Sequence, residues 1–175
     1  MLFFIFSKIT IFAKLLKSIC AMKINIDERV KRARNYFLEG YNCAQAVCIA
    51  FCDLTGFTKE QAAKMASAFG GGMGRMREVC GAVSGMLMVA GVLYGYDDPK
   101  ATKEKRELYS QVQAMAGQFR EELGSIVCRD LLKNPPSDPN PTPRTEQFYK
   151  DRPCARMVAT AARIMDEFIE QHPIV

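Results

Sequence analysis

Apolar residues recur at helical spacing along most of the chain. In residues 24–38, for example, Ile26, Val30, Ala33 and Phe37 are spaced as on one face of a helix. No stretch shows the sustained alternation of apolar and polar residues that is typical of a half-buried strand. We therefore predict an all-α fold, a single-domain bundle of about six helices.

Capping residues and prolines indicate where these helices begin and end. Asn42 and Thr58 are suitable N-caps, the latter with a partial capping box. Pro99 is expected in the first turn of a long polar helix, where proline is favoured. Residues 134–144 are rich in proline and are expected to form an extended loop. The expected helices are residues 24–38, 43–54, 59–69, 80–95, 99–123 and 154–171, with a short segment at 126–132.

The expected helix at residues 80–95 carries no charged residue and several small ones. As a membrane span it is short, and charges such as Arg77 and Asp97 flank it closely. As the central helix of a bundle it fits better, because Gly81 and Gly85 allow neighbouring backbones to approach. We therefore expect a buried, glycine-rich helix at the centre of the fold and no integral membrane span.

A glycine-rich stretch, residues 70–74, precedes this helix. It does not match a phosphate-binding loop, because no Gly-Lys-Ser/Thr motif follows it and no strand precedes it. Glycine is costly in chain entropy, so this density of glycine indicates a need for backbone freedom or close approach. We expect these glycines to let backbone amides approach a site around the sulfur of Cys80.

Residues 1–21 are set apart from the helical domain expected at residues 22–175. Their apolar start resembles the core of a signal peptide, but no basic residue precedes it and Lys8 interrupts it. Two other interpretations stay open. In the first, Met22 is the true start of the protein and residues 1–21 are upstream sequence. In the second, residues 1–21 form an amphipathic helix that lies on a surface. Cys20, within this leader, is assigned no role.

Composition and charge narrow the classes of function. The chain of 175 residues is 49% hydrophobic and 25% charged, as in a globular domain. The formal net charge is +5, and three lysines that contribute to it lie within residues 8–17. The charges in the rest of the chain are therefore too balanced to indicate nucleic-acid binding. His172 is the only histidine, which excludes a covalent haem motif and a Cys/His zinc finger.

Four of the seven cysteines are each expected in the first turn of a helix. Unpaired backbone N–H groups and the helix dipole stabilise a thiolate there, and the thiolate binds metal or attacks a disulfide. The intervals match no Cys-Xaa-Xaa-Cys pair, so spacing alone leaves one shared site and scattered buried thiols both open. The four candidate cysteines are Cys43, Cys80, Cys128 and Cys154. Cys48 and Cys52 share a helix face and are interpreted as packing.

The sequence around the four candidate cysteines resembles the C_GCAxxG_C_C family of redox-active proteins. Cys80-Gly81-Ala82-Val83-Ser84-Gly85 fits the Cys-Gly-Ala-Xaa-Xaa-Gly signature of that family. The other similar blocks, in the same order as in the family, are residues 40–47, 69–75, 128–132 and 153–158. The resemblance implies a helical, redox-active domain whose four cysteines form one site. A similar domain accompanies haem-binding segments in split-Soret cytochromes, where the cysteines are proposed to hold an iron–sulfur cluster, but this chain has no haem attachment site.

Three functions are compatible with these residues. In the first, the four candidate cysteines bind an iron–sulfur cluster, [2Fe–2S] rather than [4Fe–4S], for electron transfer or redox sensing. In the second, the same cysteines are the catalytic groups of a thiol–disulfide oxidoreductase and no cofactor is needed. In the third, they hold a structural zinc ion in a non-catalytic domain.

The sequence does not identify a redox partner protein, and it leaves the oligomeric state open, with a homodimer as one option. Unpaired thiols or a cluster indicate a reducing cytoplasm. Export is the alternative if residues 1–21 are a signal.

Overall fold

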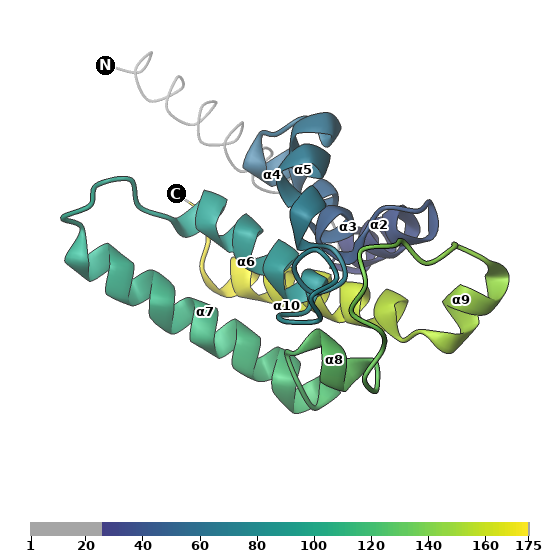
Figure 1. Cartoon of the computed structure of the whole chain (residues 1–175). Coiled ribbons are helices and arrows are strands. Elements are labelled where there is room, and N and C mark those ends of the chain that lie inside the picture. Colours follow the sequence, from purple (N-terminus) through teal and green to yellow (C-terminus); the bar gives the residue numbers. More distant parts are fainter. Residues whose placement is uncertain (1–25, 175) are drawn as a thin grey trace, which may run out of the picture.

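This computed structural model describes residues 26–174, which are mostly helical (Figure 1). The elements are α2 (Ile26–Leu38), α3 (Cys43–Ala50), α4 (Cys52–Thr55), α5 (Lys59–Ala66), the 3-10 turn η1 (Ser67–Phe69), α6 (Gly81–Tyr94), α7 (Thr102–Leu123), α8 (Cys128–Leu131), α9 (Glu146–Asp151) and α10 (Cys154–Gln171). In the described residues, the β-type pairing is one isolated antiparallel bridge between Val79 and Val127. The all-α prediction is confirmed, with six helices of eight residues or more. The predictions for residues 1–21 fall outside the described residues.

The two N-caps expected from the sequence are both present. The Asn42 side chain accepts a hydrogen bond from the backbone N–H of Gln45 at 3.0 Å, and the Gln45 side chain accepts one in return from the Asn42 backbone. Thr58 and Gln61 form the same reciprocal pair at the start of α5. These capping boxes satisfy backbone donors that have no partner within the helix. They explain why α3 and α5 begin where the sequence indicated.

Several helix limits differ from the sequence expectation. The helix expected at 43–54 is interrupted at Phe51, whose side chain is fully buried and whose backbone leaves the helical region. The long polar helix begins at Thr102 rather than Pro99, because Asp98 accepts the backbone N–H of Lys100 and holds a turn there. The short helix α9 follows the proline-rich loop and was not expected, although the Thr145 side chain caps it by accepting from the backbone N–H of Phe148 at 3.1 Å.

The core forms where α6 packs against α3 and α10. The first half of α6 is buried, and a Cβ atom at Gly85 would lie 2.7 Å from the carbonyl oxygen of Ala44 in α3. The expected central glycine-rich helix is therefore confirmed, and Gly85 is needed for the close approach of two backbones. The last turn of α6 is more exposed, and Val92 there retains 41% of its accessible surface.

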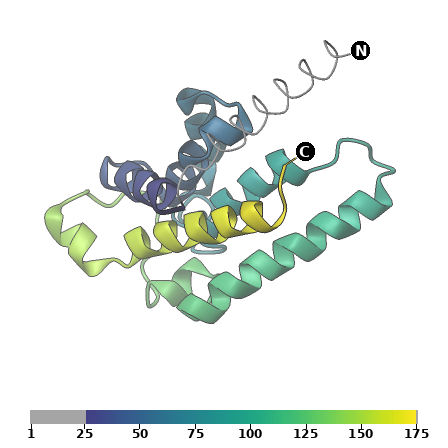
Figure 2. The ribbon, with the colours of Figure 1, turned by 180° about the vertical axis from the view of Figure 1, so that it is seen from behind.

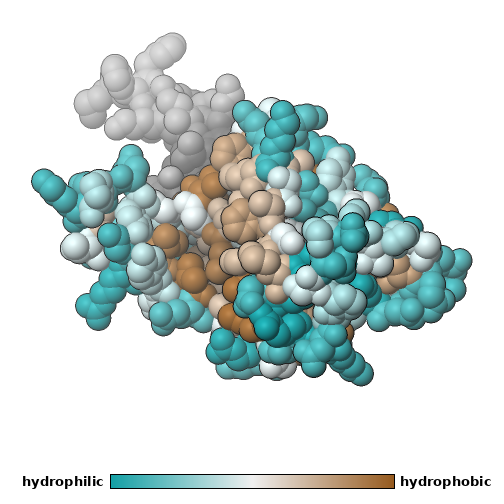
Figure 3. All heavy atoms as spheres, in the orientation of Figure 1, coloured by the Kyte–Doolittle hydropathy of each residue, from teal (hydrophilic) through white to brown (hydrophobic). Residues whose placement is uncertain are grey.

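On the opposite face of the molecule, α10 lies between α2 and α7 (Figure 2). The long helix α7 contributes only Met115 and Phe119 to the fully buried core. Apolar side chains remain visible beside α6, along its border with α7 (Figure 3). In the described residues, no helix has the length and apolar character required to cross a membrane.

A buried cluster of charged side chains connects α2 with α4 and α10. Arg29 of α2 donates hydrogen bonds to Asp166 of α10 at 2.5 Å and to Asp53 of α4 at 2.9 Å. The Arg29 side chain is only 4% exposed and that of Asp166 only 3% exposed. Burial raises the pKa of Asp166, although the adjacent Arg29 guanidinium opposes the change.

Candidate functional site

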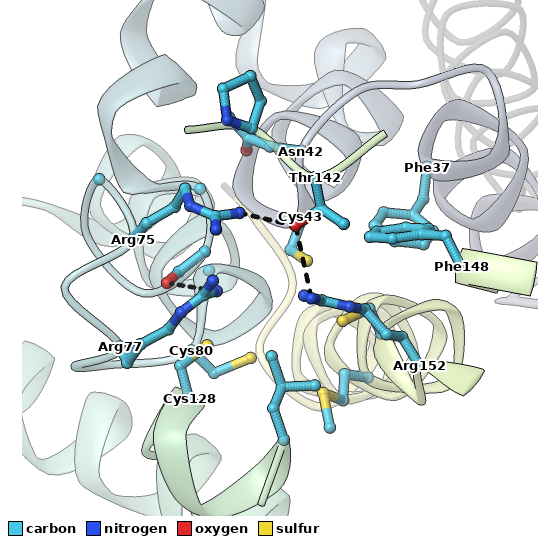
Figure 4. Close-up of a pocket in the computed structure, with 18 of the residues that line it drawn as sticks. Phe37, Asn42, Cys43, Arg75, Arg77, Cys80, Cys128, Thr142, Phe148 and Arg152 are labelled. Carbon is cyan, nitrogen blue, oxygen red and sulfur yellow. Dashed lines mark hydrogen bonds between the residues drawn. The ribbon is translucent and has the colours of Figure 1, made fainter. Parts of the chain in front are cut away.

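The structure brings the four candidate cysteines to one cavity of about 330 Å³ (Figure 4). Cys43, Cys128 and Cys154 are the first residues of α3, α8 and α10, and Cys80 is the N-cap of α6. All four are unpaired and buried, with exposed fractions between 3% and 9%. Four segments that are distant in sequence thus each place one cysteine on the same cavity.

Backbone pairing around the Val79–Val127 bridge holds Cys80 next to Cys128. The N–H of Cys80 donates to the carbonyl of Ile126 at 2.8 Å, and the N–H of Cys128 donates to the carbonyl of Glu78 at 2.6 Å. These two bonds hold the start of α6 beside the start of α8. The sequence did not indicate this pairing, because a single bridge leaves no alternating pattern.

Two glycines are required by the close approach of neighbouring chains to the cysteines. A Cβ atom at Gly72 would lie 2.6 Å from Cβ of Cys128, and Gly72 also has a positive φ of 75°. A Cβ atom at Gly81 would lie 3.2 Å from Cβ of Cys43 and 2.9 Å from the carbonyl oxygen of Phe69. Gly72 and Gly81 therefore allow close packing around the cavity.

The sulfur atoms of Cys43 and Cys154 are joined by a hydrogen bond. The bond raises the pKa of Cys43, which donates, and lowers that of Cys154, which accepts. Burial further raises the pKa of Cys43, while nearby arginines, Arg152 foremost, further lower that of Cys154. Of these two thiols, Cys154 is therefore the one that ionises more readily.

The expectation that all four helix N-termini would lower the cysteine pKa is wrong for three of them. Burial raises the pKa of Cys80 to about 12, although the backbone N–H groups of Ala82 and Val83 act against it. Burial also raises the pKa of Cys128, although the adjacent Arg77 guanidinium opposes it. The cost of moving a charge out of water exceeds the benefit of a helix terminus at these positions.

Four arginines also line the cavity: Arg75, Arg77, Arg144 and Arg152. Among the described residues that line it, none is an Asp or a Glu. Arg75 has a carboxylate nearby, since it pairs with Asp138 at 3.1 Å. The other three give the cavity a surplus of positive charge that favours an anion inside it. Sequence reasoning missed these residues, which only the fold brings together.

The proline-rich loop forms one wall of the cavity. Arg75 holds it by donating to the carbonyl of Asp138 at 2.7 Å, and Arg77 by donating to the carbonyl of Pro136 at 2.9 Å. At the end of the loop, the Arg144 guanidinium lies over the rings of Phe37 and Phe148, 4.8 and 4.7 Å from their centroids. These cation–π contacts hold the long Arg144 side chain in place.

The two remaining described cysteines do not line the cavity. Cys48 packs in the core with its sulfur 3.5 Å from the carbonyl oxygen of Gly85, and burial raises its pKa to about 12. Cys52 lies in α4, with its sulfur directed at the carbonyl of Cys48. Their arrangement agrees with the interpretation of both as packing residues.

Within residues 26–174, no group of three or more His, Cys, Asp or Glu side chains is arranged to hold a single metal ion. The four candidate cysteines are instead distributed around a cavity.

The structure thus defines a helical domain with four buried thiols on one cationic cavity. The chain belongs to the C_GCAxxG_C_C family, whose description reads "Putative redox-active protein (C_GCAxxG_C_C)" and whose model matches residues 41–168. The resemblance read from the cysteine blocks is thereby confirmed. Neither the curated proteins nor the solved structures contain a match to this chain.

Proposed function

We propose that Cys43, Cys80, Cys128 and Cys154 hold an iron–sulfur cluster and that the protein transfers single electrons or senses redox state. The observation that carries this proposal is the placement of all four thiols on one cavity. Four cysteine thiolates are the ligand set that both common cluster types require, and we favour [2Fe–2S]. When bound, the cluster would supply one-electron chemistry that no side chain of this chain provides.

The charges around the cavity support this proposal. A cluster held by four thiolates is an anion, and Arg77, Arg144 and Arg152 line the cavity without a carboxylate among its described lining residues. Arg77 is 2% exposed, and its Nη2 atom has no hydrogen-bond partner among the described residues. An unpaired buried donor is costly, so a negative group in the cavity would stabilise this arginine. Such donors and nearby positive charge also raise the reduction potential of a cluster.

The protein around the cavity would orient the cysteines and limit the access of water. The backbone N–H groups of Ala82 and Val83 act on the sulfur of Cys80 and favour its thiolate form. The loop at 134–144 covers part of the cavity through Pro139 and Thr142. Because Arg77 is almost fully buried, its charge is weakly screened and acts more strongly there than it would on a surface.

Anaerobic reconstitution with iron and sulfide tests the proposal. We expect visible absorbance, an EPR signal in one oxidation state, and bound iron and sulfide in the wild-type protein. Cys80→Ser and Cys128→Ser should each lower the iron content, whereas Cys52→Ser, which removes a thiol away from the cavity, should not. A colourless wild-type product without iron would contradict the proposal, and zinc found in its place would favour a structural metal.

The Cys43–Cys154 pair supports a second function, thiol–disulfide exchange. The Cys154 thiolate would attack a substrate disulfide and form a mixed disulfide, releasing one substrate thiolate. Cys43 would then attack the sulfur of Cys154, give its proton to the second leaving thiolate, and complete a Cys43–Cys154 disulfide. The substrate is reduced by two electrons in this sequence, and the redox partner protein would restore the dithiol.

Mild oxidation of metal-free protein tests this second function. Peptide mapping should show the loss of two thiols and a disulfide between Cys43 and Cys154. Cys43→Ala should raise the pKa of Cys154, because its hydrogen-bond donor is lost, and so move alkylation of Cys154 to higher pH. Cys48→Ala serves as the control. A disulfide between other cysteines, or an unchanged pH dependence, would count against this mechanism.

Both functions start from reduced cysteines. All six cysteines of the described residues are free. A reducing cytoplasm suits this state, and we include that location in the proposal.

A further inference from the structure

Two arginines share one neutral acceptor in the wall of the cavity. The hydroxyl of Thr142 accepts a hydrogen bond from Nη1 of Arg75 at 3.0 Å and one from Nη2 of Arg152 at 3.5 Å (Figure 4). Arg75 also pairs with Asp138, whereas in the described part of the chain no carboxylate pairs with Arg152. A hydroxyl is a weak acceptor for two positively charged groups, because charge-assisted bonds to an anion are about twice as strong.

A third arginine approaches the same cavity from its inner side. Arg77 is almost fully buried, and its Nε atom donates to the carbonyl of Pro136 at 2.9 Å. Its Nη1 atom has only a long contact of 3.5 Å with the carbonyl of Gly71, Nη2 has no nitrogen or oxygen partner among the described residues, and the guanidinium interacts with the Cys128 sulfur. In Figure 4 the Arg77 guanidinium lies between Arg75 and the sulfurs of Cys80 and Cys128. A buried guanidinium whose partners are neutral carbonyls and a thiol retains donor capacity for an anion.

Arg77 and Arg152 line the same cavity. Both lie on it together with Cys128 and Cys154. The two guanidinium groups therefore act on one common region of the cavity, although they come from segments far apart in the sequence. That region is open to solvent through the exposed lining residues Ser67, Gly74 and Pro141.

We propose that a small oxyanion binds between the guanidinium groups of Arg77 and Arg152 and the hydroxyl of Thr142, next to the candidate cysteines. The ligand class is a phosphate, sulfate or carboxylate group, either free or as part of a small organic molecule. Arginine forks match the geometry of such oxyanions. The site goes beyond the redox centre proposed above, because it assigns a place for the anionic group of a ligand that comes close to that centre.

The cavity has room for more than this anion. Its volume of about 330 Å³ is at the lower end of the range for small-molecule sites. Asn42 and Ser67 line it together with Thr142 and provide polar groups near its opening. These residues would contact the remainder of an organic ligand whose anionic group binds the arginines.

Calorimetric titration with inorganic phosphate tests the site, on reduced metal-free protein and on reconstituted protein. Arg152→Gln should weaken phosphate binding about ten- to a hundredfold, the value of one or two charge-assisted hydrogen bonds. Arg106→Gln removes an equal charge from the exposed face of α7 and should leave the affinity unchanged. Thr142→Val removes a neutral group and should also weaken binding. Thermal melts of each variant show whether it is folded.

Two results would overturn the proposal. One is a wild-type protein that does not bind phosphate, sulfate or acetate in either form. The other is a folded Arg152→Gln variant that binds phosphate as tightly as Arg106→Gln does. Comparison of phosphate with glycerol phosphate distinguishes a free anion from the phosphate group of an organic molecule. Iron content, measured on the same reconstituted samples, tests the cluster separately. A protein without iron can therefore still confirm the oxyanion site, and a protein that binds no anion can still confirm the cluster.

Discussion

At the scale of single residues, burial and partners decide what each ionisable group does. Cys43 and Cys154 both begin helices, yet the hydrogen bond between them moves their pKa values in opposite directions. Arg29 and Asp166 provide a second example, because the pair is buried and one oxygen of Asp166, Oδ2, has no hydrogen-bond partner among the described residues. Desolvation therefore dominates at Asp166 even beside an arginine.

Removal of Arg29 should destabilise the fold in a pH-dependent way. In Arg29→Met the carboxylates of Asp166 and Asp53 lose their buried cation, which should cost about 3–5 kcal/mol of unfolding free energy at pH 7. The pKa of Asp166 is already raised, and the substitution raises it further. A raised pKa in the folded state adds stability that is present at low pH and is lost as the pH rises through that value. The loss of unfolding free energy in Arg29→Met, relative to the wild-type protein, should therefore be smaller at pH 5 than at pH 7.

Urea denaturation at the two pH values measures this effect. Arg32→Met is the matched control, because Arg32 contacts Asp53 at 3.4 Å with 32% of its side chain exposed. Its loss should cost less than about 1 kcal/mol. A deficit in Arg29→Met that stays constant or grows toward pH 5 would show that Asp166 does not titrate as stated.

At the scale of elements, the contact between α3 and α6 depends on one missing side chain. Gly85 faces the backbone of α3, whereas a Cβ atom at Gly91, further along α6, would have no neighbouring atom within 4 Å. The two glycines thus have the same helical backbone and different surroundings. Packing against α3 requires glycine at position 85 but not at position 91.

Gly85→Ala and Gly91→Ala should change stability in opposite directions. In Gly85→Ala the new methyl group meets the Ala44 carbonyl, so α3 and α6 must separate, at a cost of about 1–3 kcal/mol. In Gly91→Ala the methyl group enters open space, and helix propensity should add up to about 1 kcal/mol. Urea denaturation of both variants provides the comparison. Equal effects would mean that Gly85 is not in close contact with α3.

At the scale of the whole molecule, the candidate site depends on four helices at once. Each of α3, α6, α8 and α10 contributes one cysteine, and the loop at 134–144 contributes a wall. A ligand that bonds to all four cysteines would therefore connect segments from residue 43 to residue 154. Such a ligand stabilises the folded chain by mass action, because the site does not exist in the unfolded chain.

Reconstituted protein should therefore unfold at a higher temperature than metal-free protein. The same treatment should produce a smaller increase in Cys128→Ser, which retains three of the four thiols, and an unchanged increase in Cys52→Ser. Calorimetry or circular dichroism under anaerobic conditions measures the midpoints. Equal midpoints for loaded and metal-free wild-type protein would indicate that iron, if present, is not bound by this site.

The sequence alone determined those features that depend on near neighbours. Helical periodicity predicted the all-α class, Asn42 and Thr58 marked two helix starts, and the resemblance identified the four cysteine blocks. Capping and periodic burial act over a few residues, so their signals can be read locally. The break at Phe51, a fully buried residue, was missed because tertiary packing rather than local propensity sets it, and α9 was missed although Thr145 caps it locally.

Only the tertiary structure decided the character of the candidate site. It gathered Arg77 and Arg152 around the sulfurs, paired Cys43 with Cys154, and buried Cys80 deeply enough to raise its pKa to about 12. Each of these effects depends on distances between segments that are remote in sequence, and on the exclusion of water between them. The sequence thus identified the sulfur atoms, and the fold set their charges and their neighbours.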